Sequence, residues 1–152
     1  MKTTNMEYID LGLPSGTLWA TCNVGANKPE EYGVYCTHDD AMELGVTLPT
    51  KEQIEELIKE CISVWMKQNG VNGCLFTGPN GNTLFLPAAG LYDSDSGLYG
   101  VGNCGYYWSS SLYTGGPNGS YCLYFNSGRV DWGNYYRRFY GRSVRAVKNK
   151  EE

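Results

Sequence analysis

Six cysteines and one histidine are the residues of this chain best suited to nucleophilic or metal-binding chemistry. A reactive cysteine needs a neighbour that lowers the pKa of its thiol, and a structural zinc ion needs ligands at short, defined spacings. No two cysteines form a C-x-x-C pair, and His38 has no second histidine. We therefore expect no metal or cofactor, and mostly free thiols at Cys22, Cys36, Cys61, Cys74, Cys104 and Cys122.

A second candidate for metal chemistry is the segment Asp93-x-Asp95-x-Gly97, which has the look of an oxygen-ligand loop for calcium. The position that should supply a bidentate glutamate is occupied by Cys104. Asp93 and Asp95 are therefore expected to be turn residues.

The composition of the second half of the chain points to recognition. From Asn69 to Val147 there is no Lys, Glu, Gln or Met, yet this stretch holds ten of the thirteen tyrosines, fifteen of the twenty glycines and all five arginines. Tyrosine offers a large, stiff, amphipathic contact, while Ser, Gly and Asn adapt their hydrogen bonding around it. The alternative is an ordinary antiparallel sheet, which also favours Tyr and Trp in strands and Gly and Asn in turns.

The segment 120–126 shows which residues of this stretch are tied to a core. Tyr121, Leu123 and Phe125 alternate and form one apolar face, as a strand requires. The intervening side chains at 120, 122, 124 and 126 share no chemical theme. We therefore expect the first face to be buried, together with Trp108, and the second to be exposed.

Length and charge narrow the classes of protein. A chain of 152 residues with 41% hydrophobic residues fits a single domain with a real core. A formal charge of -4 with no Lys/Arg run disfavours nucleic acid as a partner. There is no apolar run long enough to span a membrane and no basic-then-apolar start, so we expect neither a membrane span nor a signal peptide.

Local signals predict an α+β protein with one main helix. Thr50 and Gln53 fit a capping box, and Ile54, Leu57, Ile58, Cys61, Ile62 and Trp65 keep helical spacing, so a helix is predicted over 51–68 with a stop at Asn69-Gly70. A short helix is expected near 39–44. The other expected elements are hairpins over 8–22 and 74–86 and strands over 106–111, 121–125, 129–132 and 143–147.

Five motifs in order resemble the C-type-lectin-fold domains of gut Bacteroidetes and their phages, and more narrowly the variable proteins of diversity-generating retroelements. The motifs are 8–25, 48–51, 86–90, 107–111 and 141–147, beginning Tyr-Ile-Asp-Leu-Gly-Leu-Pro and ending Gly-Arg-Ser-Val-Arg-Ala-Val. In that family a reverse transcriptase mutates template adenines, so Asn codons become variable without yielding Lys, Glu, Gln, Met or Trp. The resemblance covers about residues 7–147 and implies a C-type-lectin-like fold over 1–152.

By this resemblance a variable region spans about 104–140, and 143–147 is a constant last strand. The expected variable ligand-binding residues are Tyr106, Tyr113, Cys122, Tyr124, Asn126, Arg129, Asp131, Asn134, Tyr135, Tyr136, Arg138 and Tyr140. The implied function is non-catalytic recognition of a protein or cell-surface ligand, in a chain that is cytoplasmic on synthesis or displayed on a virion or cell surface.

Two alternatives come with the same fold. Formylglycine-generating enzymes use a cysteine pair, for which Cys104 and Cys122 are the candidates, although no Lys, His or carboxylate cluster accompanies them. The other alternative is an adhesin-tip or structural domain without mutagenesis. The sequence names no ligand and no oligomeric state.

Overall fold

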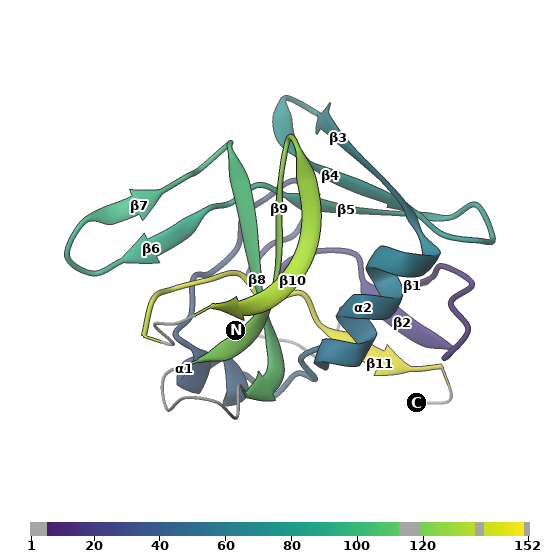
Figure 1. The fold of residues 1–152 in the computed structure, drawn as a ribbon, viewed down its shortest axis with the longest axis horizontal. Helices are drawn as coiled ribbons and strands as arrows, with labels where there is room; N and C mark the ends of the chain where they lie inside the picture. The colour runs from purple at the N-terminus through teal and green to yellow at the C-terminus, as the bar shows by residue number, and fades with distance from the viewer. Residues whose placement is uncertain (1–5, 113–118, 136–138, 151–152) are drawn as a thin grey trace.

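The first and last strands of the chain lie in the same sheet. A computed structural model describes residues 6–112, 119–135 and 139–150. Its N-terminal hairpin joins β1 (Tyr8–Asp10) to β2 (Thr17–Ala20), as predicted, and β11 (Val147–Asn149) pairs with the other edge of β2. The strands β1 and β11 therefore lie on either side of β2, at the right of the view in Figure 1.

The predicted last strand starts too early. The residues 143–146 do not form a continuous ladder: Ser143 makes an isolated bridge to Tyr107, whereas the amides of Val24 and Ala20 donate to the carbonyls of Val144 and Ala146. This segment passes between two sheets, which is why its hydrogen bonds are divided between them. The regular strand begins only at Val147.

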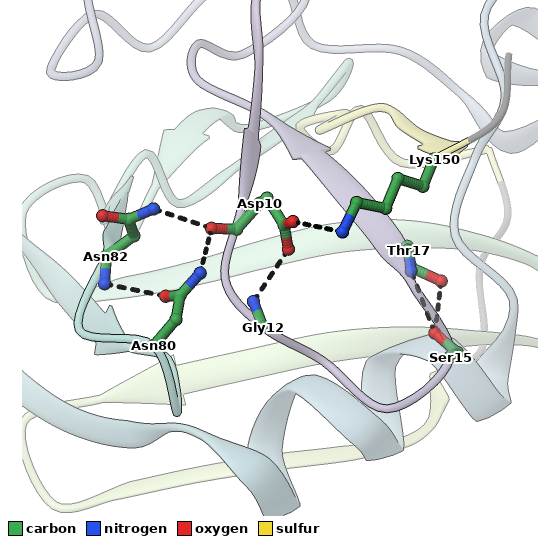
Figure 2. A network of polar contacts seen from close by, with 7 residues as sticks. All are labelled: Asp10, Gly12, Ser15, Thr17, Asn80, Asn82 and Lys150. Atoms are coloured by element: carbon green, nitrogen blue, oxygen red, sulfur yellow. Dashed lines mark hydrogen bonds and ion pairs between the residues drawn. The ribbon is translucent and has the colours of Figure 1, made fainter.

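A polar clamp around Asp10 fixes the β1–β2–β11 sheet to a distant turn (Figure 2). The main-chain carbonyl of Asp10 accepts hydrogen bonds from Asn80 Nδ2 (2.8 Å) and Asn82 Nδ2 (2.9 Å). Its carboxylate accepts from the amide of Gly12 (2.9 Å) and forms an ion pair with Lys150 Nζ (2.9 Å). Three separate parts of the chain are thus joined at one residue.

The main helix, α2 (Lys51–Glu60), begins as predicted and ends earlier. Thr50 Oγ1 accepts from the amide of Gln53, whose side-chain oxygen accepts from the amide of Thr50, so the capping box is present. The prediction that the helix continues to residue 68 is wrong. Residues 62–68 form the strand β3 (Ile62–Gln68), and Ile62, expected in the buried stripe, is 71% exposed.

The Asn69-Gly70 pair explains this difference. Both residues have positive φ angles, 49° and 83°, which is the backbone of a two-residue hairpin turn rather than of a helix stop. The turn joins β3 to β4 (Val71–Thr77), and the predicted hairpin then joins β4 to β5 (Thr83–Pro87). Pairing with β4 stabilises residues 62–68 as a strand, so tertiary contacts override the helical spacing.

A third sheet carries most of the tyrosine-rich segment. It has the order β10–β9–β8, formed by β8 (Cys104–Leu112), β9 (Ser120–Asn126) and β10 (Arg129–Tyr135). The helix α2 packs against one face of this sheet. The main apolar core lies there and includes Ile54, Leu57, Leu123 and Phe125, all fully buried.

A smaller core covers part of the opposite face. The short helix α1 (His38–Met42), close to the predicted 39–44, contributes Ala41 to a cluster with Trp108, Cys122 and Val144. A two-stranded hairpin, β6 (Leu91–Asp93) and β7 (Gly97–Tyr99), lies beside β8 (Figure 1). Neither helix in the described ranges is long and apolar enough to cross a membrane.

Candidate functional site

The two faces of β9 differ as predicted over only part of the strand. On the face toward α2, Leu123 and Phe125 are fully buried and Tyr121 is half-buried. On the other face, Tyr124 and Asn126 are half-buried. The prediction fails at Tyr121, which is not fully buried, and at Ser120 and Cys122, which are. Cys122 is buried because Trp108 and Val144 of the smaller core cover that end of the sheet.

The partly exposed end of this second face carries five of the predicted ligand-binding residues on three neighbouring strands. The strand register places Tyr106 beside Tyr124 and Tyr124 beside Asp131, while Asn126 pairs with Arg129. Directly paired residues of an antiparallel sheet project from the same face. We call Tyr106, Tyr124, Asn126, Arg129 and Asp131 the aromatic face.

Contacts within the aromatic face hold its side chains in place. The rings of Tyr106 and Tyr124 are 4.8 Å apart between centroids, and the Arg129 guanidinium lies 5.0 Å from the Tyr124 centroid. Arg129 Nε also forms an ion pair with Asp131 Oδ2 at 3.4 Å, and Asn126 Nδ2 donates to the Tyr124 hydroxyl at 3.0 Å. A ligand would therefore meet a surface that is already largely ordered, which lowers the entropic cost of binding.

The β9–β10 turn is ordered by the same asparagine. Asn126 Oδ1 accepts hydrogen bonds from the amides of Gly128 (2.8 Å) and Arg129 (3.0 Å). Such an Asx turn fixes the two-residue connection between the strands. Asn126 thus links the turn conformation to the position of the Tyr124 hydroxyl.

The buried residue Arg142 packs against Tyr106 of the aromatic face. It was not among the predicted site residues. Its guanidinium carbon lies 5.1 Å from the Tyr106 centroid and 4.6 Å from that of Trp108, and Nη1 donates to Cys122 Sγ at 3.3 Å. The pKa of Tyr106 is raised to about 12, mainly by burial. The positive charge of Arg142 acts in the opposite direction and lowers this pKa. Arg142 belongs to the motif at 141–147, of which we assigned only 143–147 to a constant strand and gave Arg142 no role.

A buried polar network anchors the scaffold behind this surface. Arg145 is fully buried, and its three nitrogens donate to Asn23 Oδ1 (2.8 Å), the carbonyl of Ala20 (3.1 Å) and the carbonyl of Phe85 (2.9 Å). Asn23 Nδ2 in turn donates to the hydroxyl of Tyr107 (3.1 Å), the residue after Tyr106. The network joins β2, β5 and β8, so it fixes the base of the strand that carries Tyr106.

The remaining predicted residues are divided between other places. Tyr140 is half-buried and packs edge-on against Phe139, with ring centroids 5.4 Å apart. Asn134 and Tyr135 lie at the end of β10, in register with Tyr121 and Ser120. Tyr113, Tyr136 and Arg138 lie outside the described residues.

Several exposed apolar side chains near this sheet were also not predicted. Leu98 and Tyr99 at the end of β7 are both more than half exposed, and so is Phe139. Tyr99 is close enough to contribute to the raised pKa of Tyr106. Composition alone did not separate these residues from the many other aromatic positions of the segment.

The candidate nucleophiles lie in surroundings that oppose thiolate formation. Burial raises the pKa of Cys122 to about 11, even though Arg142 lies beside it, and burial also raises the pKa of Cys104. In the sheet, Cys104 pairs with Asn126 and Cys122 with Trp108, which separates the two cysteines by four residues along the ladder, about 13 Å. This separation is too large for a disulfide or a concerted pair.

The other candidates for metal chemistry have structural roles. Asp93 Oδ1 accepts from the amide of Asp95 at 3.0 Å in the β6–β7 turn, as expected of a turn residue. His38 is buried, where Nε2 lies 2.9 Å from the carbonyl oxygen of Ser109 and the ring packs edge-on against Trp108. Within the described ranges, no three His, Cys, Asp or Glu side chains gather as metal ligands would.

Comparison with other proteins adds no family. No protein-family model matches this chain, and neither a curated protein nor a solved structure matches it. The aromatic face is therefore the feature from which a function is to be inferred.

Proposed function

We propose that this chain is a non-catalytic ligand-binding protein whose aromatic face contacts a protein or another cell-surface molecule. The observation that carries this proposal is the clustering of two tyrosines, an arginine, an aspartate and an asparagine on one partly exposed sheet face. Such surfaces combine rigid apolar contact with hydrogen bonding at low cost in side-chain entropy. On the other side of the same strands, the buried side chains of Tyr107, Leu123 and Phe125 hold the sheet in place.

We further propose that the fold is C-type-lectin-like and that the face is diversified by retroelement mutagenesis. The α+β architecture with short antiparallel sheets supports the first part. The positions of Tyr106, Tyr124, Asn126, Arg129 and Asp131 support the second, because a surface that varies must tolerate different side chains without disturbing the core. Cys122 is excluded from this variable surface by its burial.

Recognition is favoured over oxidase chemistry by the state of the thiols. An oxidase of the formylglycine-generating type needs an accessible thiolate, whereas burial raises the pKa of both Cys104 and Cys122. The sheet register also keeps the two apart. Ligand binding by the aromatic face, in contrast, requires no reactive thiolate.

The proposal is tested by binding and by genomic context. Fluorescently labelled protein is applied to intact bacterial cells, and we expect saturable binding that weakens at least tenfold in a Tyr106→Ser/Tyr124→Ser variant, as for loss of central aromatic contacts. Tyr32→Ser, a half-buried tyrosine outside the aromatic face, is the matched control. DNA flanking the gene is expected to hold a near-identical template repeat and a reverse transcriptase gene. Equal binding by both variants would contradict the proposed site.

A further inference from the structure

The strand β3 presents an apolar surface at an open sheet edge. It pairs with β4 on one side and, in the part of the chain that the structure describes, with no strand on the other. Ile62 and Val64 are 71% and 51% exposed, and Met66 follows on the same face of the strand. In Figure 1, β3 runs along the outer margin of the molecule.

The backbone groups at this edge are available for pairing. The amide of Ala88 donates to the carbonyl of Asn72, and the amide of Gly78 donates to that of Asn82, both at 2.8 Å. The even-numbered residues of β4 therefore bond toward β5, and its odd-numbered residues bond toward β3. By the same alternation, the amides and carbonyls of Ser63, Trp65 and Lys67 point to the open edge.

Two charged residues of opposite sign, Glu60 and Lys67, lie at the two ends of β3. Lys67 is exposed near the end of the strand, where Gln68 Nε2 also donates to Glu30 Oε2 at 2.6 Å. At its start, Glu56 and Glu60 lie close enough to Cys61 to add to the effect of burial in raising the pKa of that thiol. In a copy of the strand that runs in the opposite direction, Lys67 comes next to Glu60, which is a favourable pairing of opposite charges.

We propose that β3 pairs antiparallel with β3 of a second copy of this chain, about a two-fold axis at Val64. In this register Ile62 lies opposite Met66 of the second copy and Val64 opposite the second Val64, so the exposed apolar side chains cover each other. Lys67 lies opposite Cys61, next to Glu60. The hydrogen-bonded pairs are formed by Ser63 and Trp65, the residues whose backbone groups face the edge.

A parallel arrangement or an unrelated strand fits these observations less well. Parallel pairing would place Lys67 beside Lys67 and Glu60 beside Glu60, and like charges opposite each other destabilise a strand pair. Self-pairing joins two three-stranded sheets into one continuous sheet and removes an edge that would otherwise be prone to aggregation. It leaves both aromatic faces outside the contact, because these lie on a different sheet.

The pairing is tested by reversing one charge at a time and then mixing the two variants, which restores opposite charges at both ends. Glu60→Lys and Lys67→Glu each place like charges at both ends of a homodimer, so each variant is expected to raise the dimer dissociation constant about tenfold in low salt, measured by sedimentation velocity. A mixture of the two variants has a complementary pair at both ends and is expected to form heterodimers near wild-type affinity. Asp95→Lys, an exposed carboxylate on the β6–β7 hairpin, is the control and should leave the dissociation constant unchanged.

Hydrogen exchange locates the contact independently of charge. The amides of Ser63, Trp65 and Lys67 are expected to become protected as protein concentration rises, whereas exposed amides of the β6–β7 turn should not change. Any of three results would overturn the proposal: a monomeric wild-type chain at all concentrations, single variants without effect, or a dimer without protection at β3. Capture of a different protein by a monomeric chain would overturn it too. Melting curves of each variant confirm that it is folded, and cell binding by the aromatic face is measured separately.

Discussion

The rings of Tyr106 and Tyr124 lie 4.8 Å apart on adjacent strands, and their planes are tilted by 57°. One residue farther along each strand, Tyr107 and Phe125 stack on the opposite, buried side with ring centroids 6.1 Å apart. The same two strands thus carry one half-buried aromatic pair on the aromatic face and another pair on the core side. For the proposed binding role, this arrangement would separate ligand contact from stability, because each pair depends on different neighbours.

The first prediction contrasts the two faces of β9. Tyr124→Ser should lower the free energy of unfolding by about 1 kcal/mol or less, since the side chain is only half-buried. Leu123→Ala should lower it by about 2 to 5 kcal/mol, as for other large-to-small changes in a core. Chemical denaturation of both variants measures the difference. Equal losses would mean that Tyr124 is structural and would weaken the proposed binding role.

The second prediction concerns the buried network around Arg145. Asn23→Ala removes the acceptor of Arg145 Nε and a donor to the Tyr107 hydroxyl, which leaves buried polar groups without partners. The expected loss is about 2 to 4 kcal/mol in the free energy of unfolding. Arg145→Lys should also destabilise, because one ammonium group cannot reach three acceptors set around a planar guanidinium.

Thermal melting with a surface control checks this network. Arg129→Lys changes an exposed arginine of the aromatic face and should shift the melting temperature little. If Arg145→Lys were equally mild, the three hydrogen bonds would not contribute to stability as described.

The main helix shows where local sequence signals were sufficient and where they failed. The capping box at Thr50 and Gln53 depends on neighbouring residues alone, and it was predicted correctly. The end of the helix depends on β4, which lies later in the chain and pairs with 62–68. Ile62, Val64 and Met66 fit the period of two of a strand, whereas Ile62 and Trp65 continue the helical stripe, so the sequence did not decide between strand and helix.

The candidate site, like the main helix, was predicted correctly only where local sequence decides the structure. Alternation along β9 correctly placed Leu123 and Phe125 in the core and Tyr124 on the other face. It could not show that a second core covers Cys122, because the covering residues come from α1 and from the segment around Val144. The support given by Arg142 was hidden for the same reason, since it depends on contacts between distant parts of the chain.

The third prediction is a loss of stability in acid that depends on Asp10. The Lys150 ammonium and the amide of Gly12 hold the pKa of this carboxyl below its ordinary value of 3.8. Its contribution to stability is therefore fully present above about pH 4 and is lost as pH falls through the lower pKa of the folded state. Asp10→Asn should be less stable than the wild type at pH 7, and the difference should shrink in acid.

Denaturant titrations at a series of pH values measure this difference. Lys150→Met removes the same ion pair from the other side and should produce a similar change in the pH profile. High salt should reduce both effects, because the pair is largely exposed. A wild-type profile identical to that of Asp10→Asn would show that the clamp in Figure 2 does not contribute through its charge.

The last prediction separates recognition from thiol chemistry. In the native protein, iodoacetamide should modify the half-exposed Cys22 well before Cys74 or Cys122, because burial raises the pKa of Cys74 to about 12 and that of Cys122 to about 11. Mass spectrometry of digested samples measures the order of labelling. Urea should abolish these differences in rate, because they come from the fold.

The same thiols decide whether the chain is an oxidase. A Cys104→Ala/Cys122→Ala variant should keep its cell binding, since both thiols are buried and offer no surface to a ligand. The wild type should convert no peptide cysteine to an aldehyde in the presence of oxygen. If aldehyde formed and the double variant lost that turnover while still binding the peptide, the buried cysteines would be catalytic, because only a thiolate could account for such a selective loss.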